Sequence, residues 1–216
     1  MRKETRESQV EARWPALIAV LTLGGLYLAL PPNLVLGPRW LYPAVVAGLV
    51  VPTVLLHRKG RHDLDRVLGY ILSGVLTLAL VLSLMLLIIA LPSKKEDPFA
   101  LLESAAALWV TNVLVFALWY WRLDAGGPHG RESRTRHTHG AFFFPQMMQG
   151  APTSGEPGPW SPRFVDYLFV AFNTSTAFSP TDTPVLTRWA KALSMLQATI
   201  SLAVVAILAA RAVGML

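Results

Sequence analysis

A run of short polar residues near the C-terminus is the part of this sequence best suited to hold an ion. Its members carry hydroxyl, amide or carboxylate groups and follow an apolar stretch: Asn173, Thr174, Ser175, Thr176, Ser179, Thr181, Asp182 and Thr183. Hydroxyl and carboxylate oxygens can replace the water shell of a cation. A structural alternative stays open for Asp182, which can cap a helix that begins near Pro184, because proline is favoured in a first helical turn.

A second polar set lies on a helix predicted over 190–213. Ser194, Gln197 and Ser201 are spaced i, i+3 and i+7, so they share one face, which turns apolar at Val205 and Leu208. Such a stripe can line a pore, or it can join helices through hydrogen bonds worth about 1 kcal/mol each in a membrane. Four further polar residues lie in apolar surroundings and raise the same question: Glu103, Thr111, Asn112 and Asp166.

Catalytic and metal-binding motifs are missing from the sequence. The patterns HExxH, GxSxG, GxGxxG and the Walker motif do not occur, so no enzyme and no cofactor are predicted. Cysteine is absent, which excludes disulfides, thiolate metal sites and cysteine nucleophiles. His137 and His139, with His129 nearby, lie in an Arg-rich segment that offers no carboxylate second shell. We therefore expect no metal to be bound there, and we expect His57 and His62, which belong to a basic turn, to be solvated.

The elements that must position these residues are long and apolar. Hydrophobic residues make up 53% of the 216 residues and charged residues 15%, whereas soluble domains carry about 25% charged residues. Apolar runs cover 14–30, 41–56 with Pro52 inside, 67–91, 99–121 and 190–213. The fourth run ends in Trp119, Tyr120, Trp121 and Arg122, a pattern typical of a helix leaving the bilayer. The sequence therefore predicts an all-α membrane protein with five transmembrane helices and the lipid bilayer as its partner.

A sixth apolar stretch, 164–178, is short and becomes polar at its end. As a helix it would cover only about 22 Å of a ~30 Å hydrocarbon layer. We expect a short re-entrant helix, and a sixth spanning helix is the alternative.

The chain accordingly divides into a cytoplasmic N-terminus at 1–13, a three-helix membrane region at 14–98 and a C-terminal module at 99–216. The module consists of an outer helix at 99–121, a mobile loop at 122–163, the short helix and turn at 164–184 and an inner helix at 188–214. Within the loop, Phe142, Phe143 and Phe144 form an apolar island, for which contact with the bundle and a place at the membrane interface are both open.

The distribution of Lys and Arg predicts the orientation in the membrane. With a cytoplasmic N-terminus and a re-entrant segment, 15 Lys and Arg fall on the cytoplasmic side, and Arg39, Lys94, Lys95 and Arg211 fall on the other side. An excess of Lys and Arg in short loops marks the cytoplasmic side. We therefore expect a multi-pass protein of the cell membrane with a cytoplasmic N-terminus. The net charge of +6 then reflects orientation and not a nucleic-acid partner.

The order of elements after residue 163 resembles the pore module of tetrameric cation channels: a short helix, a Thr-rich turn, an acidic residue, a proline and a long helix. Aligned without gaps to the potassium filter TVGYGD, the segment 176–181 (TAFSPT) occupies the filter and Pro184 matches a following proline. Phe178 and Pro180 replace the two filter glycines, and proline fixes φ near −65°, so a potassium-type carbonyl ladder is not expected. The layout also resembles an uncharacterised family of small bacterial multi-pass membrane proteins with a degenerate pore loop.

This resemblance implies a homo-oligomeric ion channel without a potassium-type filter, open to monovalent cations. Its constriction would contain Thr176, Ser179, Thr181 and Asp182, and its inner-helix polar face would contain Ser194, Gln197 and Ser201. The alternative is a non-conducting membrane scaffold or interaction protein that retains the fold. The charge distribution further implies that the module enters from the cytoplasmic side, as in the inverted pores of glutamate-gated channels.

Overall fold

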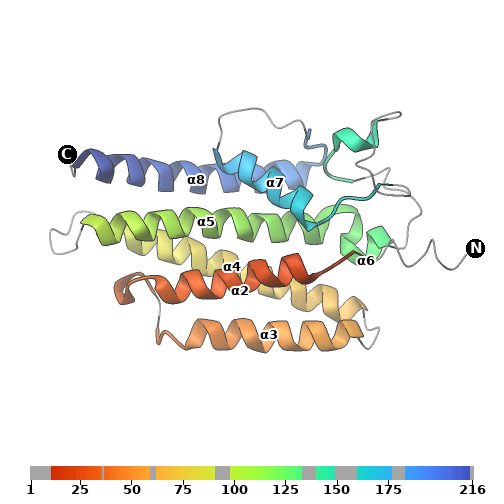
Figure 1. Cartoon of the computed structure of the whole chain (residues 1–216), viewed down its shortest axis with the longest axis horizontal. Helices are drawn as coiled ribbons and strands as arrows, with labels where there is room; N and C mark the ends of the chain where they lie inside the picture. The colour runs from red at the N-terminus through yellow and green to blue at the C-terminus, as the bar shows by residue number, and fades with distance from the viewer. Residues whose placement is uncertain are drawn as a thin grey trace, which may run out of the picture.

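The protein is a bundle of helices that lie along one long axis (Figure 1). The structure, a computed structural model, describes residues 11–35, 37–58, 62–90, 98–132, 140–148, 160–176 and 183–214. Within these ranges every regular element is an α-helix or a 3-10 helix, apart from an isolated β-bridge between Phe142 and Val185. The described residues therefore form an all-α fold, as the sequence predicted.

Five long helices make up the body of the bundle. They are α2 (Trp14–Ala29), α3 (Leu41–Arg58), α4 (His62–Ala90), α5 (Pro98–Leu123) and α8 (Arg188–Gly214). Three stretches are long and apolar enough to cross a membrane: Leu64–Ala90, Phe99–Glu132 and Arg188–Ala210. The apolar helices at Trp14–Ala29 and Leu41–Thr53 are shorter. The described residues thus contain three helices with the length and composition of membrane spans.

Proline residues shape the N-terminal helices. Pro15 lies in the first turn of α2, where its missing N–H group breaks no helical hydrogen bond. Leu30, which ends this helix, is extended with ψ 144°, as expected for a residue that precedes a proline. The 3-10 helix η1 (Pro32–Leu34) follows, and α3 then continues through Pro52 without ending.

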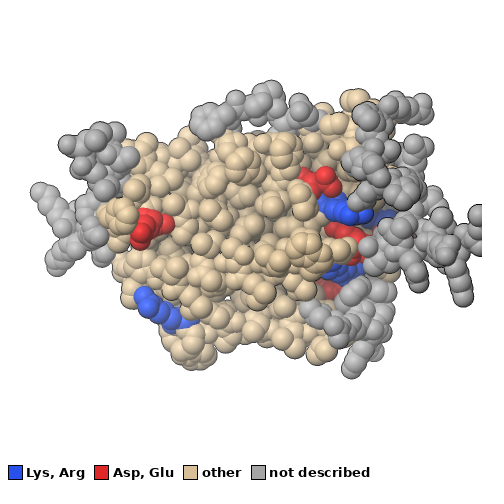
Figure 2. Space-filling model, in the orientation of Figure 1, with Lys and Arg blue, Asp and Glu red and all other residues tan. Residues whose placement is uncertain are grey.

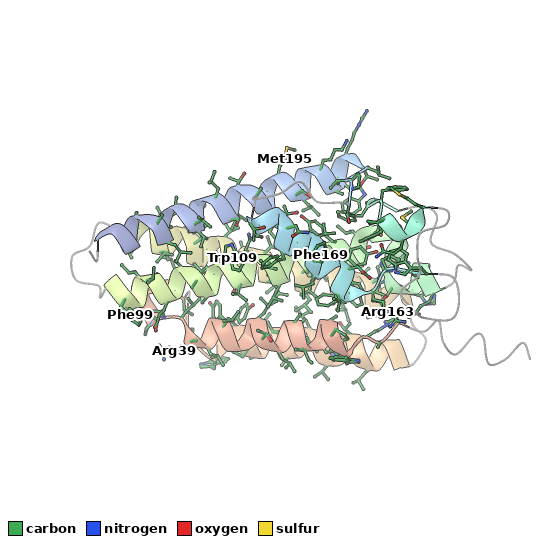
Figure 3. All side chains as sticks on the ribbon, turned by 45° about the horizontal axis from the view of Figure 1, so that its top comes forward. Arg39, Phe99, Trp109, Arg163, Phe169 and Met195 are labelled. Carbon is green, nitrogen blue, oxygen red and sulfur yellow. The ribbon has the colours of Figure 1, made fainter. Side chains whose placement is uncertain are left out.

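α5 is the central helix of the bundle. It contacts α2, α4, α7 and α8, whereas α3 lies at the edge against α4 and α2 (Figure 1). Side chains in its second half are enclosed, with Val115, Phe116 and Tyr120 all 0% exposed. α8 is packed on one side only, and Met195 on its outer side points away from the bundle (Figure 3). Residues at the contact between α5 and α8 are therefore buried at the centre of the C-terminal module.

α7 (Phe164–Thr176) is a short helix that covers only part of the bundle's length (Figure 1). Its 13 residues correspond to about 20 Å of helix. The chain after α7 is fixed near the end of the bundle where α7 begins, because the Phe143 N–H donates to the Pro184 carbonyl (2.9 Å) and the Leu186 N–H to the Ala141 carbonyl (2.7 Å). α7 and α8 therefore start at the same end of the bundle.

The segment that follows α5 is packed against the bundle. It contains η2 (Asp124–Gly126), α6 (Gly127–Glu132) and η3 (Pro145–Met147). Phe142 and Phe144 are buried. The expectation of a mobile loop over 122–163 is therefore wrong for the described residues 122–132 and 140–148. Of the two positions left open for the phenylalanine island, contact with the bundle is confirmed.

Charged residues gather at the two ends of the face shown in Figure 2. The middle of that face carries a wide band without Lys, Arg, Asp or Glu, and the larger charged group lies at the end where α2, α4 and α8 begin. Large apolar side chains are exposed on the long helices, among them Leu21 at 73%, Ile89 at 72% and Leu202 at 71%. This band, called the apolar belt below, suits contact with hydrocarbon.

Candidate functional site

Gln197 lies where α5, α7 and α8 meet, and its side chain is fully buried. Its Nε2 donates to the carbonyl of Ala171 (2.7 Å) and to Oγ of Ser175 (2.8 Å), both on α7. Its Oε1 accepts a hydrogen bond from the hydroxyl of Tyr120 on α5 (2.6 Å). One side-chain amide therefore ties α8 to both neighbouring helices.

Asn112 of α5 extends this arrangement toward the middle of the bundle. Its Nδ2 donates to the main-chain carbonyl of Gln197 (3.2 Å) and, at a longer distance, to Oγ of Ser175 (3.4 Å). The Ser201 hydroxyl donates to the carbonyl of Ser175 (2.5 Å). Asn112 Oδ1 is buried and has no hydrogen-bond partner among the described residues. Asn112, Tyr120, Ser175, Gln197 and Ser201 are called the buried polar cluster below.

The predicted polar face of the inner helix turns toward this cluster. Gln197 and Ser201 are 0% and 2% exposed. Ser194 is half-buried and accepts a hydrogen bond from the Tyr120 hydroxyl (3.2 Å). All three side chains thus bind α5 or α7 of the same chain. The arrangement corresponds to the second alternative considered for this stripe, which is hydrogen bonding between helices.

The four filter-like residues are only partly described. Thr176 is the last residue of α7, and its hydroxyl donates to the carbonyl of Asn173 in its own helix (3.1 Å). Ser179, Thr181 and Asp182 lie outside the described residues, and so does the predicted capping role of Asp182. The predicted constriction therefore stays a prediction.

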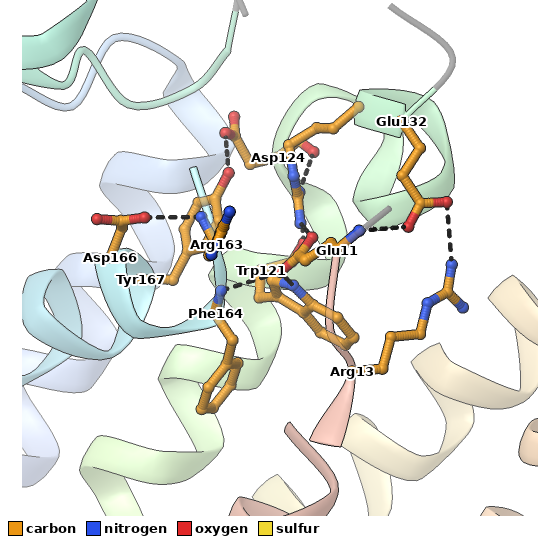
Figure 4. A network of polar contacts seen from close by, with 10 residues as sticks. Glu11, Arg13, Trp121, Asp124, Glu132, Arg163, Phe164, Asp166 and Tyr167 are labelled. Carbon is orange, nitrogen blue, oxygen red and sulfur yellow. Dashed lines mark hydrogen bonds and ion pairs between the residues drawn. The ribbon is translucent and has the colours of Figure 1, made fainter. Parts of the chain in front are cut away.

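A second polar network closes the end of the bundle where α5 ends (Figure 4). Arg131 of α6 forms an ion pair with Glu11 (3.0 Å), and the two side chains are 1% and 8% exposed. The Arg131 guanidinium also donates to the carbonyls of Trp121 (2.8 Å) and Asp124 (3.1 Å). It lies 5.0 Å from the ring centre of Tyr167, a cation–π contact. Glu11, Trp121, Asp124, Arg131 and Tyr167 are called the end network below.

Glu11 holds the N-terminal segment against the starts of two other elements. Its Oε1 accepts from the indole N–H of Trp121 (2.6 Å) and from the backbone N–H of Phe164 (2.9 Å). Because Phe164 is the first residue of α7, this carboxylate satisfies a backbone donor that a helix start leaves unpaired. The segment before α2, the end of α5 and the start of α7 therefore meet at one side chain.

Asp124 and Asp166 fix the segments around the start of α7. Asp124 accepts from the Tyr167 hydroxyl (2.6 Å) and from the backbone N–H of Ala141 (2.5 Å). Asp166 caps the helix by accepting from the backbone N–H of Arg163 (2.7 Å). Burial raises the pKa of the Asp166 carboxyl above its ordinary value, and the hydrogen bond from Arg163 opposes this rise.

Phe142 lies between the two polar groups. Its ring centre is 5.0 Å from that of Tyr120, 6.0 Å from that of Tyr167 and 6.4 Å from that of Trp189. Tyr120 belongs to the buried polar cluster and Tyr167 to the end network. The aromatic side chain therefore connects both groups and packs against α7 at Tyr167.

The sequence reasoning missed the role of Tyr120 in the buried polar cluster and four members of the end network, which are Glu11, Asp124, Arg131 and Tyr167. The role of Tyr120 as a partner of Gln197 could have been found, because its eight-residue spacing from Asn112 places both on one side of α5. Arg131 gave no local signal, since it lies in a segment rich in Gly, Arg and His. Glu103, also considered as a membrane-embedded polar residue, is exposed near the start of α5.

Metal binding has no support in the part of the chain that is described. No group of three or more His, Asp or Glu side chains in that part could hold a metal ion. His137 and His139 lie outside the described residues.

The fold and the two polar groups together define a helical protein with membrane-length helices and a short helix that is fixed at both of its halves. Comparison with protein-family models, with curated proteins and with solved structures finds no match for this chain. No relative therefore bears on the resemblance to cation-channel pore modules.

Proposed function

We propose that this chain is a multi-pass protein of the cell membrane in which α5, α7 and α8 form a closed, non-conducting module that serves as a membrane scaffold. In this proposal α2 and α3 join the three longer helices as spans, and α7 enters the bilayer part of the way. The apolar belt between the charged ends supports the membrane location. The starts of α2, α4 and α8 lie at one end, where the sequence places most Lys and Arg, which supports a cytoplasmic N-terminus.

The buried polar cluster is the observation that carries the scaffold proposal. A side chain that lines a water-filled pore has to keep its polar atoms available to ions or water. Gln197 instead directs both ends of its amide to groups of the same chain, and Ser201 donates to α7. The polar stripe of α8 thus joins α8 to α5 and α7 by hydrogen bonds and does not face a water-filled pore.

The outer face of α8 has no second polar stripe that could line a pore, among the described residues. Its exposed residues at membrane depth are mostly apolar, among them Met195, Leu196, Leu202 and Val205. Thr199 is the exposed exception, and its hydroxyl donates to the Met195 carbonyl of its own helix (2.9 Å). This surface suits lipid tails or another apolar helix.

The second candidate is the homo-oligomeric channel for monovalent cations, and one observation favours it. α7 starts at one end of the bundle, stops at Thr176 part of the way along it, and is followed by a chain that returns to the same end. A pore helix with its following loop has this course. In this candidate the constriction is built where several copies meet, at the turn that contains Ser179, Thr181 and Asp182.

A flux measurement on the purified chain in liposomes separates the two candidates. We expect potassium and sodium flux no greater than in protein-free vesicles, under ion gradients and under imposed voltage, with a known cation channel as positive control. Chemical cross-linking of the same vesicles reports whether copies associate. Cation flux above background that Thr176→Val reduces would contradict the scaffold and establish the channel.

The proposed orientation predicts a difference in labelling between two single cysteines. Because the chain contains no cysteine, each substitution creates a unique thiol. Ser161 and Arg39 are both exposed. Ser161 is two residues before Arg163, and Arg163 lies at the opposite end of the bundle from Arg39 (Figure 3). In intact cells a membrane-impermeant maleimide should label Arg39→Cys, and should label Ser161→Cys only after permeabilisation. The reverse pattern would invert the topology.

A further inference from the structure

A cavity of about 190 Å³ opens at the charged end of the bundle and is lined by residues of α2, α3, α4, α5 and the turn after α5. Its enclosed part is apolar and includes the buried side chains of Val20 and Leu72 together with Val50 of α3. Its outer part includes Arg66, Arg122 and the exposed turn at Gly126. The cavity thus combines an apolar wall with a basic mouth, which is the polarity of an amphiphile.

The charges at the mouth are not balanced by the described carboxylates. Arg13 pairs with Asp65 (3.3 Å) and Glu132 (3.6 Å). Arg66 donates to the Gly126 carbonyl (3.3 Å), which carries no formal charge. In the described part of the chain neither Arg66 nor Arg122 has a carboxylate at ion-pair distance. Among the described residues, Arg13, Arg66 and Arg122 therefore face two carboxylates, so one net positive charge remains for an anion.

Arg122 is held in place by packing and not by hydrogen bonds to described residues. Its guanidinium carbon lies 5.6 Å from the ring centre of Trp121, and its Nε is buried without a hydrogen-bond partner in that part of the chain. A Cβ atom on Gly69 would lie 1.8 Å from Nη1 of Arg122, so the missing side chain of Gly69 makes room for the guanidinium. A desolvated guanidinium without a partner is costly, and a bound anion would remove that cost.

The size and position of the cavity select a lipid. The cavity opens at the charged end of the bundle, next to the apolar belt, which is the depth at which lipid headgroups lie. The volume of about 190 Å³ is below the ~300–1,000 Å³ of sites that enclose a whole small molecule. It suits one headgroup phosphate and the start of an acyl chain whose remainder stays in the bilayer.

We propose that this cavity binds an anionic phospholipid of the cytoplasmic leaflet, with its phosphate at Arg122 and Arg66 and the start of one acyl chain against Val20, Val50 and Leu72. Basic pockets between membrane helices on the cytoplasmic side are suited to such headgroups. Arg66 and Arg122 both line the cavity, and arginine donates in a fixed fork that matches phosphate oxygens. This proposal does not depend on whether the module of α5, α7 and α8 conducts ions.

Lipid retention by the full-length protein tests the site. The protein is purified in mild detergent, incubated with phosphatidylglycerol or with phosphatidylcholine of the same acyl chains, and analysed by native mass spectrometry. We expect preferential retention of phosphatidylglycerol. An arginine near the surface contributes about 1 kcal/mol to anionic-lipid binding, so Arg122→Gln should weaken retention about fivefold. Arg39→Gln, which removes the same charge at the opposite end, should leave it unchanged.

Two further arms identify the ligand's source and guard against misfolding. Val50→Phe fills the apolar part without altering charge, and should also weaken retention; circular dichroism and thermal melting report whether each variant is folded. Millimolar inorganic phosphate should not displace the lipid. Displacement by phosphate, equal retention of the two lipids, or unchanged retention in folded Arg122→Gln would each overturn the proposal.

Discussion

Replacing Arg131 by methionine is expected to lower the free energy of unfolding by about 3–5 kcal/mol, the largest single-residue effect predicted for this protein. The guanidinium is 1% exposed and serves Glu11 and the carbonyls of Trp121 and Asp124 at once. Methionine fills a similar length but donates no hydrogen bond. Removing the cation therefore leaves the buried Glu11 carboxylate without its charge partner and two carbonyls without a donor. Thermal unfolding of the purified protein in detergent measures the loss.

A double substitution identifies the cause of that loss. If the uncompensated Glu11 carboxylate is responsible, Glu11→Gln combined with Arg131→Met should be more stable than Arg131→Met alone. Arg188→Met removes an exposed arginine from the start of α8 and serves as the matched control, with an expected change within about 0.5 kcal/mol. An Arg131→Met protein as stable as Arg188→Met would show that the end network contributes little to stability.

The positions of the long helices could be predicted because their signals are local. The apolar run 99–121 corresponds to α5, and 188–214 coincides with α8. The short helix was expected over 164–178 and is observed over Phe164–Thr176. Uninterrupted apolar residues bounded by Pro or by charges determine such boundaries without help from the rest of the chain.

The packed segment after α5 could not be predicted because its partners are distant in sequence. Arg131 binds Glu11 across 120 residues, and Phe142 pairs with the backbone near Val185. The composition of 122–163, rich in Gly, Pro and Arg, is typical of an unpacked loop. Burial of a few aromatic and charged residues by other helices overrides that composition. The hydrophobic pattern along the chain does not predict contacts between residues that are distant in sequence.

Most of the buried polar cluster was indicated by sequence, but its use was not. The spacing of Ser194, Gln197 and Ser201 predicted a shared face, and Asn112 stood out as a polar residue in an apolar run. Periodicity places side chains on a face but does not say what lies opposite. Only the position of α7, which lays Ser175 against α8, decides that the face points inward.

Replacing Gln197 by methionine is expected to lower the free energy of unfolding by about 2 kcal/mol and to loosen α7 more than the rest of the bundle. The variant loses the bonds to Ala171 and Ser175 and the bond from Tyr120. Tyr120 keeps Ser194 as a partner and Ser175 keeps Asn112, so the loss should fall between one and three net hydrogen bonds of about 1 kcal/mol each. Melting temperature and backbone amide exchange along α7 measure both effects.

Thr199→Val is the matched control for this variant. It removes a hydroxyl from the exposed side of the same helix, where the bond is only to its own backbone, so α7 exchange should be unchanged. Equal exchange in Gln197→Met and Thr199→Val would show that the buried polar cluster does not hold α7.

The Gln197→Met variant also distinguishes the two candidate functions. A scaffold should lose stability and stay silent in liposomes, whereas in a channel a loosened α7 would displace the turn that follows it and change cation flux.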